Sequence, residues 1–232
     1  MVPAYNEELE LPATLQSIAR SADSIPEEYE IIVVDDASTD ATAELARQAG
    51  ARVVAIDRRQ IAAARNAGAR SARGDVLVFV DADTRIKSHH VTGALAALRE
   101  GCVGGGARLI TDGEIPRWSR ISIFVFTAIY FGVNLGAGAF LFTSRAHFEA
   151  AGGFDEQYFA GEEVYFSLAL RRLGRFRILR EPIVTSGRKL RMYSAGYILW
   201  KTLAIVLGGP NVARSRQRLD LWYDGKREKK PV

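Results

Sequence analysis

Short apolar runs alternate with amphipathic segments along the first hundred residues. The runs at 29–34, 52–56 and 76–80 are rich in Val and Ile and lack polar alternation. This is typical of strands that are buried on both faces of a parallel sheet. Between them, residues 12–22, 41–49 and 61–72 place small and apolar side chains at helical spacing. Strands and helices in alternation predict an α/β fold with a mostly parallel central sheet flanked by helices.

The same pattern, less regular, continues after residue 100. We expect strands at 102–110, 136–143 and 175–184, and helices at 88–99, 145–150, from 161 onwards and at 193–207. The length of 232 residues and the 48% hydrophobic content suit one large domain with a substantial core. We place this domain at 1–190, with a first half at 1–100 and a second half at 101–190. Residues 191–232 form a C-terminal appendage with an amphipathic helix and a basic tail.

Two of the predicted strands end in closely spaced acidic residues, Asp35-Asp36 and Asp81-Ala82-Asp83. Open α/β sheets bind ligands just beyond the carboxyl ends of their strands. Neighbouring carboxylates repel each other unless a cation accompanies them. Oxygen ligands suit Mn²⁺ or Mg²⁺, which keep coordination positions for substrate phosphates. The pattern therefore predicts a metal–diphosphate site, and the structural alternative is a solvated turn with an Asp helix cap.

Other nucleotide-binding patterns are missing from the sequence. No Gly-x-Gly-x-x-Gly follows a predicted strand, and there is no phosphate-binding loop with a Lys. Dinucleotide-binding and NTPase interpretations therefore lose support.

Six motifs in a fixed order carry a resemblance to a known family. They are Pro-Ala-Tyr-Asn-Glu at 3–7, Val-Asp-Asp-Ala-Ser-Thr-Asp at 34–40, Arg-Asn-Ala-Gly at 65–68, Asp-Ala-Asp at 81–83, Gly-Gly-Phe-Asp-Glu at 152–156 and Gly-Glu-Glu at 161–163. Together they resemble family 2 glycosyltransferases, which have the Rossmann-like GT-A fold of nucleotide-diphospho-sugar transferases. The resemblance implies a sugar donor linked to a nucleotide diphosphate, with UDP or GDP expected. The Gln-x-x-Arg-Trp motif of processive members is missing, which favours transfer of a single sugar.

The resemblance also implies which residues bind the nucleoside. The base and ribose pocket would be lined by Pro3, Ala4, Tyr5 and Glu7. The base would bond to Asp35 or Asp36, and we favour Asp35 because only one of two adjacent side chains can face the pocket. The alternative for Tyr5 is a surface aromatic without a ligand.

Three further residues are implied on the phosphate side of the donor. Asp81 would touch the ribose or the sugar, and Asp83 would hold the metal, with Asp81 as a second ligand. Arg65 would lie near the diphosphate or the sugar, unless it is the partner of a local carboxylate. Apart from the resemblance, Arg188 or Arg191 in the basic segment after 187 is a candidate for the diphosphate, and the alternative is a basic surface turn.

Glu162 and Glu163 are the candidates for the catalytic base. Inverting transfer needs one carboxylate to take the proton of the acceptor hydroxyl as that oxygen attacks the anomeric carbon. We favour Glu163 and keep Glu162 as the second choice. The family often has Glu-Asp here, so Glu-Glu is a mild departure from its pattern. The structural alternative is that both stabilise a helix through its dipole.

Charge and hydropathy suggest a surface for an anionic partner. Residues 188–232 hold 11 Lys and Arg against three Asp and Glu, a net of +8, although the whole chain carries only +4. Residues 121–144 carry no charge, but Gly and Asn interrupt them, so we expect an apolar helix at 118–131 and not a membrane span. That helix and the one at 193–207 are candidates for peripheral membrane contact, and docking on the domain or on a second subunit is the alternative. We expect no nucleic-acid partner and leave a homodimer open.

The location in the cell follows from weaker signals. Cys102 is the single cysteine, which is compatible with a reducing compartment. The chain shows no signal peptide, and Val2-Pro3 reads as the end of a strand whose beginning lies further upstream. We expect a cytoplasmic protein, at the cytoplasmic face of the membrane if the acceptor is lipid-linked.

The sequence therefore predicts a metal-dependent inverting glycosyltransferase that moves one sugar to an unidentified acceptor hydroxyl, lipid-linked or part of a cell-envelope glycan. One alternative is a sugar-phosphate nucleotidyltransferase, although its Gly-rich activation loop is missing near the N-terminus. The other is a non-catalytic, membrane-associated nucleotide-binding protein, against which the intact acidic pairs argue.

Overall fold

The computed structural model describes residues 1–113, 135–194, 196–198, 200–201, 212–216 and 219. Three parallel strands form the first sheet in the order β1-β2-β3: β1 (Val2–Ala4), β2 (Ile32–Asp36) and β3 (Arg52–Ile56). The second sheet has the order β4-β7-β6-β8-β5: β4 (Val76–Val80), β5 (Thr84–Arg85), β6 (Gly104–Thr111), β7 (Phe140–Ser144) and β8 (Phe176–Thr185). The predicted α/β fold is confirmed.

The two sheets meet where β1 lies beside β4. The amino group of Met1 donates to the carbonyl of Val78 at 2.7 Å, and the N–H of Val80 donates to the carbonyl of Met1 at 3.0 Å. The carboxyl ends of β1, β2 and β4 consequently lie at one edge, where the predicted ligand site requires them.

The second sheet is mixed, whereas the first is wholly parallel. Strand β7 runs antiparallel to β4 and β6, β5 runs antiparallel to β8, and only β6 and β8 are parallel. Strand β7 also begins at Phe140 and not at residue 136 as expected. The loop before it wraps closely around Arg65, since a Cβ on Gly138 would lie 2.6 Å from Nη2 of that residue.

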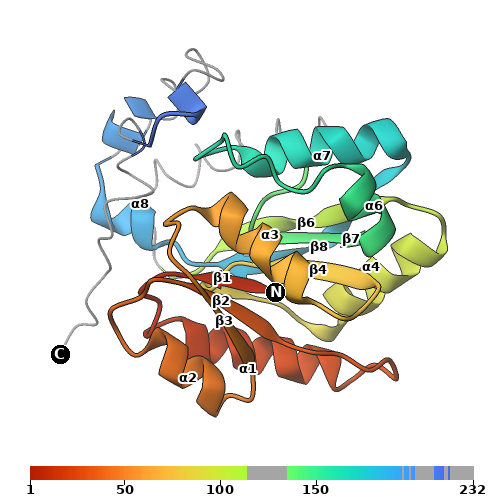
Figure 1. The fold of residues 1–232 in the computed structure, drawn as a ribbon, viewed down its shortest axis with the longest axis horizontal. Helices are drawn as coiled ribbons and strands as arrows, with labels where there is room; N and C mark the ends of the chain where they lie inside the picture. Colours follow the sequence, from red (N-terminus) through yellow and green to blue (C-terminus); the bar gives the residue numbers. More distant parts are fainter. Residues whose placement is uncertain (114–134, 195, 199, 202–211, 217–218, 220–232) are drawn as a thin grey trace.

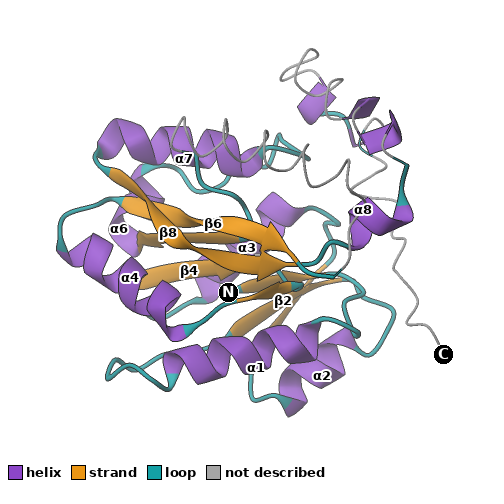
Figure 2. Ribbon diagram, turned by 180° about the vertical axis from the view of Figure 1, so that it is seen from behind, coloured by secondary structure: helices purple, strands orange, loops and turns teal. Residues whose placement is uncertain are grey.

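Helices cover both faces of the sheets (Figure 1). On one face lie α1 (Leu11–Ala22), α2 (Thr42–Gln48) and α4 (Ser88–Arg99); on the other lie α3 (Ile61–Ser71), α6 (Arg145–Ala150) and α7 (Glu162–Leu173). The view from behind shows the short α8 (Arg188–Met192) beyond the end of β8 (Figure 2).

An aromatic cluster fixes the second half of the chain against β4. The ring of Phe154 contacts Phe79 of β4 edge-on, with centroids 5.1 Å apart, and lies 4.2 Å from Phe166 of α7. Such pairs contribute about 0.5–1.5 kcal/mol beyond their buried area. The cluster holds the start of α7 beside the strand that carries the Asp-Ala-Asp motif.

The expected apolar helix at 118–131 and most of the expected helix at 193–207 lie outside the described residues, as does the tail at 220–232. The described residues 212–216 lie between the second of these helices and the tail in the chain. Here the carbonyl of Ala213 accepts the N–H of Phe159 at 2.8 Å. Arg214 packs over the ring of Tyr158, 4.9 Å from its centroid. Among the described residues, no helix has the length and apolar character needed to cross a bilayer.

Candidate active site

The adjacent carboxylates at the end of β2 have different partners. Asp36 accepts three backbone N–H groups, from Arg58, Arg59 and Gln60, at 2.7, 2.8 and 2.7 Å. It therefore fixes the loop between β3 and α3. Asp35 accepts the N–H of Ser38 at 3.2 Å. Asp36 is thus occupied by the backbone, whereas Asp35 has one such bond. This agrees with our preference for Asp35 as the base-binding residue, which stays a prediction.

One non-glycine residue with left-handed backbone follows each strand of the first sheet. The φ angles are 51° at Asn6, 59° at Ala37 and 50° at Arg59. Such residues cost free energy and persist where their surroundings hold them. Here the N–H of Asn6 donates to the hydroxyl of Ser38 at 3.0 Å, and the side chain of Asn6 accepts the N–H of Thr39 at 2.8 Å. The loops that would surround a nucleoside are therefore fixed to one another.

The ring of Tyr5 is covered by a residue that sequence analysis missed. The guanidinium carbon of Arg59 lies 3.3 Å from the centroid of the ring. The face of an aromatic ring attracts a cation that lies above it. No pattern in the sequence marks Arg59, because it follows another arginine in a polar loop.

Arg65 joins three parts of the site in what we call the Arg65 cluster: Arg65, Asp81 and Glu162. Its Nη1 donates to Oε1 of Glu162 at 2.5 Å, and its Nη2 donates to Oδ1 of Asp81 at 2.9 Å. The same Nη2 donates to the carbonyl of Gly138 at 3.0 Å. The side chains of Arg65 and Glu162 are only 1% and 4% exposed. Arg65 thus bonds to local carboxylates, and its predicted place near the diphosphate or the sugar stays a prediction.

Arg188 organises a second group, the Arg188 cluster: Arg188, Glu7 and Asp83. Its two terminal nitrogens donate to the two carboxylate oxygens of Glu7 at 2.6 and 2.7 Å. Its Nη2 also lies 3.2 Å from Oδ2 of Asp83. The carboxylate of Glu7, predicted to line the nucleoside pocket, is therefore bonded to an arginine that lies 181 positions further along the chain.

The two carboxylates of the Asp-Ala-Asp motif are consequently held by different arginines. Asp81 bonds to Arg65 from α3, and Asp83 bonds to Arg188 from α8. These contacts bring together the ends of β1 and β4, the start of α7 and the segment after β8. The predicted residues Glu7, Arg65, Asp81, Asp83, Glu162 and Arg188 thus form two connected groups at one edge.

Burial and charge change the pKa of two acidic groups at this edge, Glu163 and Asp81. Burial, reinforced by Glu162 and opposed by Arg65, raises the pKa of Glu163 to about 8. Burial also raises the pKa of Asp81 to about 6, although Arg65 opposes the rise. A carboxyl group with a pKa near neutral can exchange a proton at working pH, which is what a general base requires.

Asn66 is another residue to which sequence analysis gave no role. Its side chain donates to the carbonyl of Phe154 at 2.8 Å and accepts the N–H of Phe154 at 2.9 Å. The Arg-Asn-Ala-Gly and Gly-Gly-Phe-Asp-Glu motifs therefore bond to each other. Asn66 lies inside one of the six motifs, so the sequence marked it as a candidate. Its bonding partner could not be predicted, because Phe154 lies 88 positions away.

The donor set fits Mn²⁺ or Mg²⁺ bound together with phosphate. Among the described residues, no group of three His, Cys, Asp or Glu side chains could hold a metal ion. Asp81 and Asp83 offer carboxylate oxygens, and Mg²⁺ is commonly bound by one or two carboxylates plus substrate phosphates. The 3.2 Å contact of Asp83 with Arg188 shows that a positive group already fits against this carboxylate.

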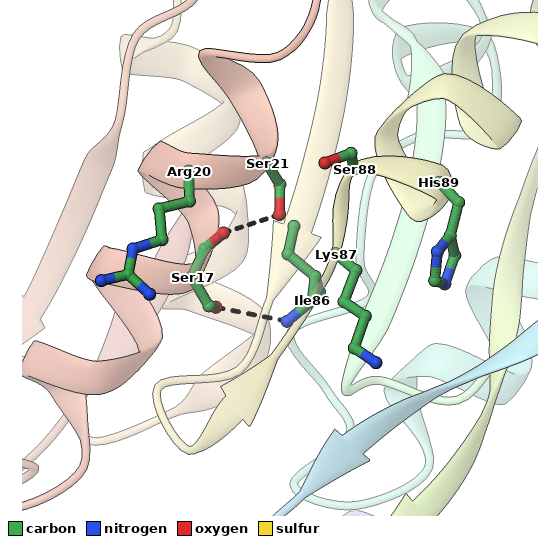
Figure 3. Close-up of a pocket in the computed structure, with 7 residues that line it drawn as sticks. All are labelled: Ser17, Arg20, Ser21, Ile86, Lys87, Ser88 and His89. Atoms are coloured by element: carbon green, nitrogen blue, oxygen red, sulfur yellow. Dashed lines mark hydrogen bonds between the residues drawn. The ribbon is translucent and has the colours of Figure 1, made fainter.

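A separate cleft between α1 and α4 contains none of the predicted site residues (Figure 3). It has a volume of about 460 Å³ and is lined by Ser17, Arg20, Ser21, Ile86, Lys87, Ser88 and His89. Two of its hydroxyls serve the local backbone: that of Ser17 accepts the N–H of Ile86 at 3.2 Å, and that of Ser21 donates to the carbonyl of Ser17. The chemistry of the acidic strand ends lies elsewhere.

Comparison with known proteins gives consistent matches over most of the chain. The family model described as "Glycosyl transferase family 2" matches residues 1–180. A relative from Aeromonas hydrophila, an undecaprenyl-phosphate 4-deoxy-4-formamido-L-arabinose transferase, is 32% identical over 108 residues, which cover 44% of this chain and 33% of the relative. The chain spans about a third of the length of the first curated relatives it matches.

Two solved structures illustrate the likeness in fold. A mannosyltransferase from Pyrobaculum calidifontis in complex with GDP-Man and Mn²⁺ has a TM-score of 0.66 and 22% identity, covering 92% of this chain and 61% of that one. Glucosyl-3-phosphoglycerate synthase from Mycobacterium tuberculosis, in complex with Mn²⁺, UDP and glucosyl-3-phosphoglycerate, has a TM-score of 0.61 and 21% identity, covering 89% and 77%. These matches confirm the predicted GT-A fold.

Proposed function

The chain belongs to glycosyl transferase family 2, and on this basis we propose that it moves one sugar from a nucleotide-diphosphate sugar to an acceptor hydroxyl. The donor is UDP- or GDP-linked, and the transfer inverts the anomeric carbon. The GDP-Man and UDP held by the two structural neighbours support this donor class.

One observation carries the proposal: each carboxylate of Asp-Ala-Asp is engaged by a different buried or partly buried arginine. Acidic turns that serve only to cap a helix need no such partners. Here the arginines hold carboxylates and cations at the edge where open α/β sheets bind ligands. A diphosphate and a divalent cation suit such a mixed arrangement of charge.

In the proposed reaction, Glu163 takes the proton of the acceptor hydroxyl while that oxygen attacks the anomeric carbon. Glu162 is bonded to Arg65 and therefore holds the first turn of α7 in place. Asp83, with Asp81, would hold Mn²⁺ or Mg²⁺, which when bound offsets negative charge on the departing diphosphate. Asp35, Tyr5, Pro3 and Ala4 would hold the nucleoside.

For the acceptor, we propose a lipid-linked substrate used at the cytoplasmic face of the membrane. The Aeromonas relative is named for undecaprenyl phosphate, and residues 188–232 carry a net charge of +8. Flotation with anionic liposomes tests this directly. Protein that stays wholly in the soluble fraction at low salt would contradict it.

The test of the catalytic assignment compares Glu163→Gln with Glu162→Gln. We expect Glu163→Gln to lower kcat by about 10²–10⁴-fold, because the base is lost, with donor affinity unchanged. Donor affinity is measured by calorimetry, and NMR of the product reports the anomeric configuration. Transfer by Glu163→Gln at the wild-type rate would assign the base elsewhere.

The pH dependence of the wild type provides an independent test. Only the deprotonated form of Glu163 can accept a proton, and its pKa is raised to about 8. We therefore expect kcat/KM to rise with pH until about 8, falling about tenfold per pH unit below that value. A profile that is flat between pH 6 and 8 would contradict the assignment.

A further inference from the structure

Asp83 already has a cationic partner in the protein itself. Its Oδ2 lies 3.2 Å from Nη2 of Arg188, and the hydroxyl of Thr185 donates to its Oδ1 at 3.4 Å. A divalent cation bound through Asp83 must therefore approach a carboxylate that Arg188 partly neutralises. The cation and the guanidinium repel each other at such a distance.

The surroundings make this competition substantial. The side chains of Arg188, Glu7 and Asp83 are 13%, 8% and 18% exposed, so water screens their charges poorly. Although burial works against it, bonding to Glu7 and the charges of Asp83 and Glu10 raise the pKa of Arg188 above its ordinary value. Arg188 keeps its proton and its charge.

Arg188 is also built to exchange partners. A guanidinium donates two parallel hydrogen bonds to a phosphate as readily as to a carboxylate. The backbone before it is fixed, because the N–H of Ser186 donates to the carbonyl of Asp83 at 3.1 Å and that of Gly187 donates to Asp112 at 2.9 Å. An exchange of partners would then move the Arg188 side chain and leave the backbone before it in place.

We propose that Arg188 makes the binding of the divalent cation conditional on the diphosphate. This inference rests on the proposed function. Without diphosphate, Arg188 holds Asp83 and Glu7 and weakens cation binding. A bound diphosphate supplies oxygens to which Arg188 turns, and Asp83 is released to the cation. Cation and diphosphate then strengthen each other's binding by the same factor, as linkage requires.

The experiment measures Mn²⁺ alone, UDP and GDP alone, and each pair together, by calorimetry on wild type and Arg188→Gln. We expect the variant to bind Mn²⁺ alone at least about fivefold more tightly and the diphosphate at least about fivefold more weakly, and to lose the cooperativity between them. The opposite signs distinguish the exchange from a merely structural role, which weakens both.

Arg85→Gln is the matched control. Arg85 also bonds two carboxylates, those of Glu10 and Asp112, at 2.6 and 3.4 Å, but neither is a predicted ligand. It removes the same charge from the same edge without releasing Asp83. Equal tightening of Mn²⁺ in both variants would mean a general effect of charge and would overturn the proposal.

The remaining outcomes are also decisive. Unchanged or weaker Mn²⁺ binding by Arg188→Gln overturns the proposal, because Asp83 gains nothing from losing Arg188. If neither UDP nor GDP binds to the wild type, the proposed donor class fails, yet the Mn²⁺ measurement still upholds or overturns the competition for Asp83. Should Arg188→Gln fail to fold, Arg188→Lys is expected to show smaller shifts with the same signs, and shifts of other sign overturn the proposal.

Discussion

The Arg65 cluster and the Arg188 cluster hold the two carboxylates of one three-residue turn, but in different surroundings. In the first, Arg65 and Glu162 are 1% and 4% exposed, and Asp81 is 26% exposed. In the second, Arg188 is 13% exposed, Glu7 8% and Asp83 18%, so the clear difference in burial is between the two arginines. The first cluster bonds α3 to α7 and to the loop before β7, whereas the second closes the segment after β8 onto the first loop.

The difference in exposure between Arg65 and Arg188 indicates a difference in role. A buried arginine cannot leave its carboxylates without exposing an uncompensated charge to a poorly solvating interior, which is strongly unfavourable. A partly exposed arginine can exchange one anionic partner for another at smaller cost. We therefore regard the Arg65 cluster as the fixed frame of the site and the Arg188 cluster as its exchangeable part.

The largest expected effect comes from removing the fixed arginine. Arg65→Met leaves Glu162 buried without its counter-charge, and we expect the free energy of unfolding to fall by about 3–5 kcal/mol. Urea denaturation measures this. The double variant Arg65→Met/Glu162→Gln should recover part of the loss, because the stranded charge is gone. A loss below about 1 kcal/mol in the single variant would remove the distinction between the clusters.

A smaller loss is expected at the exchangeable arginine. Arg188→Gln removes charged hydrogen bonds to Glu7, and we expect the free energy of unfolding to fall by about 1.5–3 kcal/mol. The same denaturation experiment measures it, and the protein should stay folded for the binding assays. If Arg188→Gln costs as much as Arg65→Met, both clusters are structural and the proposed exchange loses its basis.

The smallest change in the free energy of unfolding is expected at an exposed arginine, which serves as a reference for Arg65 and Arg188. Arg99 forms an ion pair with Glu27 at the surface, where its side chain is 67% exposed. Exposed pairs contribute about 0–1 kcal/mol, so Arg99→Ala should change the free energy of unfolding by less than that. A change as large as that of Arg188→Gln would show that exposure does not rank these arginines.

The elements that the sequence predicted well are those defined by local pattern. Strand β4 and helix α6 have the expected bounds, and α7 begins at Glu162, one residue after the expected start. Acidic residues end β2 and follow β4 at one edge, as the alternation of strands and helices implied. In these cases the information lies within a few residues of the element.

The partners of the site residues could not be predicted, because they lie far apart in the chain. Nothing near Glu7 or Asp81 indicates that one bonds to Arg188 and the other to Arg65. The antiparallel direction of β7 could not be predicted for a similar reason. Strand direction depends on the connection to the neighbouring strand and not on the five residues of β7 itself. The choice of Glu163 over Glu162 rests on the resemblance, and the structure adds two physical reasons that the sequence could not show. Arg65 bonds to Glu162, and burial raises the pKa of Glu163 to about 8.

The central claim is that the acidic strand ends bind a nucleoside diphosphate together with a divalent cation through Asp83. Calorimetric titration of UDP and GDP, with and without Mn²⁺, on wild type and Asp83→Ala tests it most directly. Asp75→Ala is the control. Asp75 is exposed and lies just before the start of β4, whereas Asp83 lies after its carboxyl end. We expect Mn²⁺ to tighten binding of one diphosphate to the wild type and to Asp75→Ala, and this gain to fall at least about tenfold in Asp83→Ala. Binding that Asp83→Ala leaves unchanged, or no binding of either diphosphate to the wild type, would contradict the account.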